Sequence, residues 1–121
     1  MANTFKVVTF AAEPNSAGTP YVVYTAGSGV TAVVLGLILT NINTAKVTAE
    51  VELVSTTSSR GGNNDVANGT AFLAKDIPIP VGSSVELLSG NKVVLETTDQ
   101  IRIDCSVADK LSGALSVMEI T

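Results

Sequence analysis

The segment Lys46-Val-Thr-Ala-Glu-Val-Glu-Leu53 decides the fold, because it alternates apolar and polar residues. Side chains two residues apart in a β-strand lie on the same face, so this period predicts a strand with one face on a core and one in water. The segment Ile101–Val107 repeats the alternation. The residues expected to point into the core are Val47, Ala49, Val51 and Leu53 in the first segment, and Ile101, Ile103, Cys105 and Val107 in the second.

Turn-forming residues such as Gly, Pro, Asn and Asp recur at short intervals along the rest of the chain, and the segments between them are rich in Val, Ile, Leu and Thr. Short strands at this spacing are typical of a sandwich or a barrel. No window of helical length carries an apolar period of 3.6 residues. We therefore predict an all-β, antiparallel β-sandwich of about eight short strands, jelly-roll or immunoglobulin-like, with residues 1–121 forming a single domain.

The composition argues against several classes of function. The 121 residues have a formal charge of −4 and the seven basic residues are scattered, so we expect no binding to nucleic acid or to an anionic membrane. The chain has no histidine and no phosphate-binding motif, which removes the most common general base and most zinc sites. Glu50 and Glu52, two apart on one strand face, are interpreted as ordinary polar surface. We expect no enzymatic activity, no catalytic residues and no cofactor.

The cysteine content and the apolar runs indicate where the protein is made. Cys105 is the only cysteine, so an intrachain disulfide is excluded, and we expect it to be buried and inert. No apolar leader follows Met1, and the longest apolar run, Ala32–Leu39, is far short of the ~20 residues that span a bilayer. These features favour a protein made in the cytoplasm of its host.

The segment Val30–Thr40 is apolar on both of the faces that a strand would present. We expect Val33, Leu35, Leu37 and Leu39 on one face, and Val34 and Ile38 on the other. An antiparallel sandwich buries only one face of each strand, so something must cover the second. Either another part of the same chain or another subunit can do so. The second alternative makes Val34 and Ile38 candidate interface residues.

Two further segments are candidates for contact with partners. The prolines in Asp76-Ile-Pro-Ile-Pro80 remove hydrogen-bond donors, which predicts an edge or crossover segment with Ile77, Pro78 and Pro80 as candidate interface residues. The polar, Gly/Asn-rich residues 55–68 are predicted to form an exposed contact loop. The residues selected in that loop are Arg60, Asn63, Asn64 and Asp65. Its centre, Gly61–Asp65, has oxygen ligands suited to calcium, but a flexible loop without metal is the favoured interpretation.

Two stretches of the chain resemble small virion proteins of tailed bacteriophages, especially those of cyanobacteria and marine bacteria. They are residues 20–41, beginning Pro20-Tyr-Val-Val-Tyr, and residues 75–102, which contain Pro80-Val-Gly-Ser-Ser-Val-Glu86 followed by Lys92-Val-Val-Leu-Glu-Thr-Thr-Asp99. The resemblance implies a particle component such as a capsid decoration (cement) protein, or a neck, tail or fibre component. It implies localisation in the virion and symmetric homo-oligomers, for which a trimer is one form. The implied partners are copies of the chain and other virion proteins such as the major capsid protein.

A second interpretation is a tail- or fibre-associated binding module that recognises a host-surface glycan or protein. Sugar binding usually uses exposed aromatic rings, and this chain has few aromatic residues. Tyr21 and Tyr24 are expected on opposite faces of one strand, which leaves at least one of them able to reach the surface. Because no repeat or coiled-coil stalk accompanies them, the capsid decoration protein is the favoured prediction.

Overall fold

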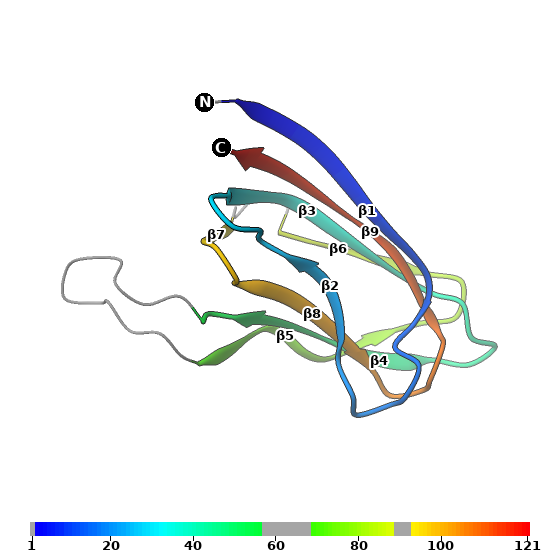
Figure 1. The fold of residues 1–121 in the computed structure, drawn as a ribbon. Helices are drawn as coiled ribbons and strands as arrows, with labels where there is room; N and C mark the ends of the chain where they lie inside the picture. The colour runs from blue at the N-terminus through cyan, green and yellow to red at the C-terminus, as the bar shows by residue number, and fades with distance from the viewer. Residues whose placement is uncertain (1, 57–68, 89–92) are drawn as a thin grey trace.

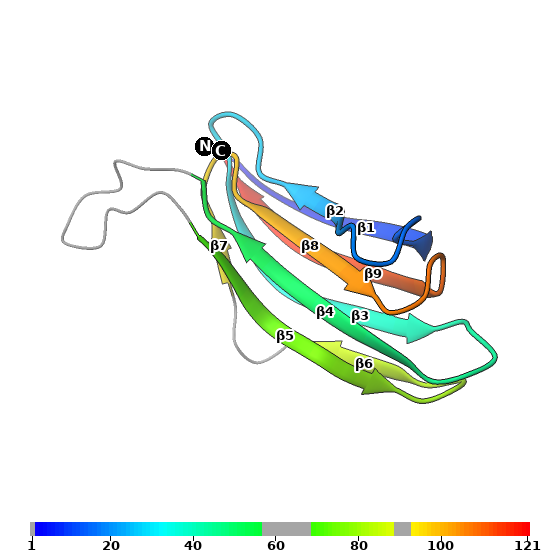
Figure 2. The ribbon, with the colours of Figure 1, turned by 90° about the horizontal axis from the view of Figure 1, so that it is seen from below.

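A computed structural model describes residues 2–56, 69–88 and 93–121, which form two antiparallel sheets packed face to face (Figure 1, Figure 2). Sheet A has the strand order β1-β9-β3-β6, with β7 also paired to β3, and sheet B has the order β2-β8-β4-β5. The described residues contain strands and no helix, hence no helix able to cross a membrane. The strands are β1 (Asn3–Glu13), β2 (Tyr21–Thr25), β3 (Thr31–Asn41), β4 (Val47–Val54), β5 (Thr70–Ile79), β6 (Ser84–Leu87), β7 (Val93–Leu95), β8 (Gln100–Cys105) and β9 (Leu111–Ile120).

The order of pairing identifies the sandwich as a jelly roll. The first strand pairs with the last, β2 with β8, β3 with β6 and β7, and β4 with β5, all antiparallel. β6 and β7 lie one after the other along β3 and so share one position in sheet A. A sandwich of eight strand positions nested in this way is a jelly roll, whereas an immunoglobulin-like fold groups its strands differently. The predicted all-β sandwich is confirmed, and the jelly-roll topology is the correct one of the two alternatives.

The core between the sheets consists mainly of Val, Leu and Ile side chains. The alternation predicted for β4 and β8 is confirmed, because the inward-facing residues of both strands are buried, apart from the half-buried Leu53. The inward position predicted for Val107 is wrong. β8 ends at Cys105, so Val107 lies in the following turn and is exposed.

A β-bulge in β3 reverses the alternation that the sequence predicted for this strand. Val34 pairs with Val117 of β9 and Gly36 pairs with Ser116, so Leu35 is an extra residue on the β3 side. One inserted residue moves the side chains before it to the opposite face from the expected one. Val34 is consequently 0% exposed in the core, and its assignment to an outer interface is wrong. Leu35, predicted to be in the core, is only partly buried.

The prediction that the proline-containing segment lies at an edge is confirmed, since β5 is the last strand of sheet B. Its pairing with β4 shifts register twice, on either side of Val51, and Asp76 has a φ of 50°. Pro78 and Pro80 are exposed, whereas Ile79 between them is buried in the core. Bulges and prolines at an edge strand interrupt the row of hydrogen-bonding groups that another strand would need.

A chain of three polar side chains joins the two sheets near the chain termini. The Tyr24 hydroxyl of β2 donates a 2.5 Å hydrogen bond to Glu119 Oε2 of β9, and Lys6 Nζ of β1 lies 2.8 Å from Glu119 Oε1. The hydrogen bond from Lys6, and then that from Tyr24, lower the pKa of Glu119. Burial and the neighbouring carboxylate raise the pKa of Tyr24. The cluster therefore holds a charged Glu119 between the ends of the two sheets.

Replacing Glu119 with glutamine should make the free energy of unfolding less dependent on pH in the acidic range. The pKa of Glu119 is lower in the folded chain than its ordinary value of 4.5, so its stabilising effect is present above that pH and is lost as the pH falls through the folded pKa. Wild type should be more stable than Glu119→Gln at pH 7, and the gap should narrow as the pH falls below 4.5. Urea unfolding at several pH values measures this. Glu86→Gln, outside the cluster, controls for the loss of one negative charge, and a gap independent of pH would contradict the assignment.

Candidate functional site

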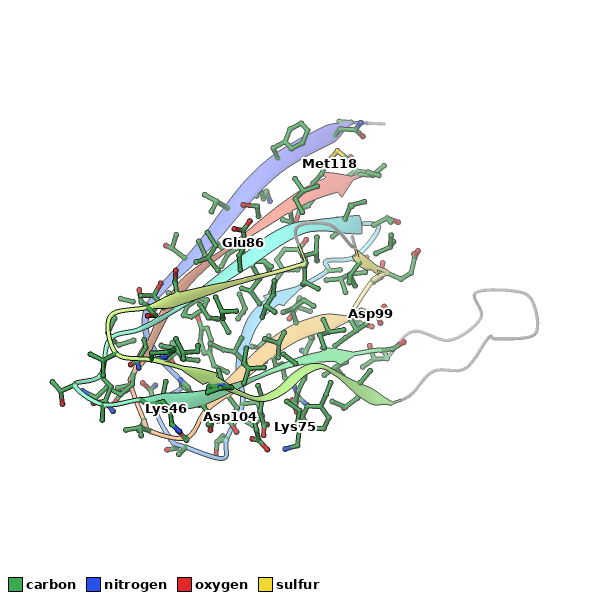
Figure 3. All side chains as sticks on the ribbon, turned by 180° about the vertical axis from the view of Figure 1, so that it is seen from behind. Lys46, Lys75, Glu86, Asp99, Asp104 and Met118 are labelled. Carbon is green, nitrogen blue, oxygen red and sulfur yellow. The ribbon has the colours of Figure 1, made fainter. Side chains whose placement is uncertain are left out.

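The outer side of sheet A presents apolar side chains that no described part of the chain covers. β1 contributes Phe5 and Val7, which are 71% and 63% exposed, and β3 contributes Ile38, which is 44% exposed. Val94 of β7 is 55% exposed on the same side. Figure 3 shows this side, with Met118 and Glu86 over the strands of sheet A. We call this surface the outer apolar face and define it by Phe5, Val7, Leu35, Ile38, Val94, Ala114 and Met118.

Two shallow grooves cross the outer apolar face, one on each side of Leu35. The first, about 370 Å³, is lined by Leu35, Gly36, Leu37, Ile38, Glu86, Ala114 and Ser116. The second, about 360 Å³, is lined by Phe5, Lys6, Val7, Leu35, Ser116 and Val117. Small residues at the bulge and in β9 form the hollows, and the larger side chains beside them protrude. Because the bulge at Leu35 turns this side chain outward, it also produces the ridge between the two grooves.

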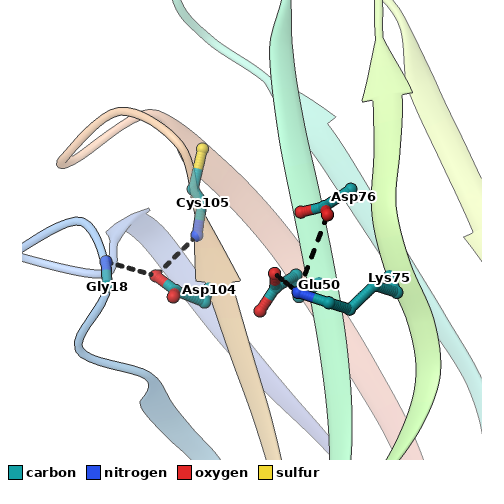
Figure 4. Close-up of polar contacts among 6 residues, drawn as sticks. All are labelled: Gly18, Glu50, Lys75, Asp76, Asp104 and Cys105. Atoms are coloured by element: carbon teal, nitrogen blue, oxygen red, sulfur yellow. Dashed lines mark hydrogen bonds and ion pairs between the residues drawn. The ribbon is translucent and has the colours of Figure 1, made fainter.

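The outer side of sheet B differs from that of sheet A because ion pairs lie on it, beside the exposed side chains of Val22 and Phe72. Lys75 Nζ lies 2.6 Å from Glu50 Oε1 and 3.6 Å from Asp76 Oδ2 (Figure 4). Arg102 of β8 lies 3.0 Å from Glu52 of β4, and this ion pair explains why Glu52, predicted to face water, is buried. A sheet surface with these charges is stable in contact with water, whereas the outer apolar face is stabilised by contact with other apolar groups.

A small polar hollow on sheet B brings three carboxylates together beside a lysine. Glu50, Asp76 and Asp104 line this hollow of about 140 Å³. Asp104 accepts hydrogen bonds from the backbone amides of Gly18 and Cys105, which accounts for its burial where the sequence predicted exposure (Figure 4). Lys75 engages the other two carboxylates. Among the residues that the structure describes, no group of three or more acidic, Cys or His side chains is arranged to hold a metal ion.

The remaining predicted site residues fall in different places. Ile38 is exposed on the outer apolar face, whereas the partly buried Ile77 and the exposed Pro78 and Pro80 belong to the edge of sheet B, so they do not form one patch with Ile38. The predicted contact loop with Arg60, Asn63, Asn64 and Asp65, and the Gly61–Asp65 calcium alternative, lie outside the described residues.

Cys105 is buried as predicted, and burial is the largest of the effects that raise the pKa of its thiol. Tyr24 is buried against Glu119, and Tyr21 packs against Phe10 at 5.9 Å between ring centroids. Neither tyrosine therefore offers a free ring for sugar stacking. Phe5 and Val7, the most exposed large apolar residues of the described part of the chain, were missed by the sequence analysis. Their signal was an apolar residue at both odd and even positions of Phe5–Phe10.

No protein-family model and no curated protein sequence matches this chain. Solved structures with a similar fold include one described as the structure of the infectious bursal disease virus Gx strain. It matches 97% of this chain and 32% of its own with a TM-score of 0.51 and 14% identity. A crystal structure of the infectious bursal disease virus VP2 subviral particle matches 96% of this chain and 32% of its own, with a TM-score of 0.50 and 13% identity. This chain spans about a third of the length of each. At these identities the likeness shows the fold alone, a β-sandwich that also occurs in the structures of a virus and of a subviral particle.

Proposed function

We propose that this protein is a non-enzymatic structural component of a virus particle, held by contacts between protein subunits. The observation that carries the proposal is the outer apolar face, which is wide, uncovered and opposite a charged sheet. Exposed apolar surfaces of this kind mark sites of protein association. The jelly-roll fold, which occurs in viral capsid domains, and the likeness to structures of a virus and a subviral particle support a place in the virion.

The occupant of the outer apolar face is a second copy of this chain. A two-fold axis near Leu35 places the Phe5 side of one copy over the Ile38 groove of the other, so the protruding Phe5 of each copy faces that groove and the two Leu35 side chains meet at the axis. A face that contains both the protrusion and the matching hollow is self-complementary.

The area of the face is also sufficient for a specific contact. Four strand positions at a spacing of ~4.8 Å, with a rise of ~3.3 Å per residue along strands of up to 11 residues, cover at most roughly 700 Å² on each copy. Two copies then bury up to about 1,400 Å² in total, and this upper bound lies within the ~1,200–2,000 Å² of specific protein interfaces. Copies joined in this way form a symmetric building block.

The more specific role, a capsid decoration protein of a tailed phage, rests on the sequence resemblance. With this role we also propose the major capsid protein as a partner and synthesis in the host cytoplasm. Electron microscopy of particles with and without this protein tests this role. Added density on the outside of the shell, together with greater resistance of the particles to heat, is the expected result. Density confined to the neck, tail or fibre would contradict the decoration role and leave a different structural position. Particles that contain none of the protein would overturn the virion assignment.

Placing a lysine in the centre of the outer apolar face should prevent self-association. Ala114→Lys puts a long, charged side chain into the first groove, which the second copy has to cover, and burying that side chain should raise the dissociation constant by about 100-fold. Sedimentation velocity over a range of concentrations measures the effect.

The matched control for this experiment is Thr48→Lys, which adds the same charge to the outer side of sheet B. Wild type and Thr48→Lys should form the same oligomer, and Ala114→Lys should be a folded monomer. A wild-type protein that stays monomeric at millimolar concentration, or equal effects of the two lysines, would show that the face does not bind a second copy.

A further inference from the structure

The free edges of the two sheets differ in how well they are protected from pairing with another strand. β5 has Pro78 within it and two register shifts, and β2 is five residues long with a register shift of its own. The edge opposite β1 in sheet A is divided between the four residues of β6 and the three of β7. Short strands, bulges and prolines are the features by which proteins keep edge strands from pairing.

β1 has almost none of these protections. It is 11 residues long, contains no proline, and pairs with β9 in regular register from Asn3 to Phe10. Figure 1 shows β1 as the outermost strand of sheet A. Its one basic residue, Lys6, is held at 2.8 Å by Glu119 of the neighbouring β9, which directs the charge toward the inside of the sheet. Within the described residues, β9 is the only strand that pairs with β1.

The hydrogen bonds at the start of β1 establish which backbone groups face the open edge. Ala2 and Thr121 exchange both of their backbone hydrogen bonds, at 3.3 and 3.0 Å, so they form a hydrogen-bonded pair. Such pairs alternate along an antiparallel ladder. The regular register therefore directs the amide and carbonyl groups of the even-numbered residues toward β9. Those of Asn3, Phe5, Val7 and Thr9 point outward, to the open edge.

We propose that this edge is a second self-association site, at which β1 of one copy pairs antiparallel with β1 of another about a two-fold axis at Val7. This register places Val7 opposite Val7, and Phe5 opposite Thr9, which are favourable cross-strand combinations of β-branched and aromatic residues. Moving the axis by one residue to Lys6 keeps the free groups aligned but places two Lys6 residues opposite each other, which is unfavourable. The edge is thus complementary to itself in the register centred on Val7. The joined sheets extend the outer apolar face across both copies.

The pairing does not rest on the proposed function, because it follows from the free backbone groups of β1 rather than from the outer apolar face or the virion assignment. The two contacts also involve separable residues. The axis at the edge lies on β1, and Ala114 and Ile38, which test the face, lie on β9 and β3. A protein that uses both contacts can build assemblies larger than a dimer, as a particle component must.

The test is amide hydrogen exchange of the wild-type protein, resolved by residue with NMR, at low and high concentration. The amides of Phe5, Val7 and Thr9 should exchange at least tenfold more slowly at the high concentration. The amides of Thr4, Lys6 and Val8 donate to β9 in either state and serve as internal controls. Ala114→Lys, which blocks the face, should retain the slow exchange of the three odd-numbered amides.

Thr9→Pro should abolish this concentration dependence and weaken the edge dimer by about 10- to 100-fold, since each copy loses one outward donor. Its ring leaves the ladder to β9 intact, so the thermal melting curve should stay close to that of wild type. Thr9→Val, which keeps the donor, is the matched control and should pair like wild type. Odd-numbered amides that exchange rapidly at every concentration would overturn the proposal, whether the protein is then monomeric or associated through the face. An equal response of Thr9→Pro and Thr9→Val would also overturn it.

Discussion

Val34→Asp should prevent the protein from folding. Val34 is 0% exposed among the side chains between the sheets, and aspartate there would place a carboxylate in a core cluster that contains no basic residue. Burying a charged or unpaired polar group in such surroundings costs several kcal/mol. That cost is comparable with the 5–15 kcal/mol that typically separates a native domain from its unfolded state. Circular dichroism and thermal unfolding at neutral pH should show loss of the cooperative transition.

The control is the same substitution four residues along the same strand. Ile38 is 44% exposed on the outer apolar face, so Ile38→Asp should fold, and its free energy of unfolding should fall by no more than about 1 kcal/mol. It should nevertheless weaken self-association through the face, because the carboxylate would be covered by the second copy. Equal tolerance of aspartate at both positions would mean that Val34 does not lie in the core and that the bulge at Leu35 is absent.

Gly113→Ala should also be strongly destabilising, by about 3 kcal/mol or more, because strand β9 passes its neighbours too closely for a side chain. A Cβ at Gly113 would meet the backbone oxygen of Ile38 and the ring of Phe10, the latter at 2.6 Å. The ring could shift, but the backbone of β3 is fixed by its pairing with β9. Relief of the clash would require the central strands of sheet A to separate. Urea unfolding of the two proteins gives the difference directly.

The next residue of β9 provides the comparison for this glycine. Ala114 points to the outer apolar face, so Ala114→Ser should change the free energy of unfolding by no more than about 0.5 kcal/mol. A Gly113→Ala protein as stable as Ala114→Ser would show that β3 and β9 are not packed as closely as described. Comparing these two substitutions also distinguishes packing inside sheet A from effects on the outer face, since Gly113 lies beside the core residue Phe10.

The outer apolar face was foreseen only in part. The sequence showed that Val30–Thr40 is apolar on both sides and that its second side needs a cover, and Ile38 does lie on the exposed side. Val34 was assigned to the wrong side because alternation was extended through Leu35 without an interruption. Bulges depend on how two strands pair, and Gly36 was the only local sign that regular pairing would break there.

The sequence by itself determined the class of fold and the core-facing residues of β4 and β8. The alternation of apolar and polar residues in β4 and β8 is a local property, because it depends only on which side chains of one strand share a face. It can therefore be recognised without knowing which strands lie beside it. The jelly-roll order, the bulge at Leu35, the joining of Phe5 and Val7 to Ile38 in one face, and the open edge of β1 were decided by the tertiary structure. Each of them depends on pairing between strands far apart in the chain, such as β1 with β9, and the apolar pattern of one strand does not specify which partner it takes or in which register.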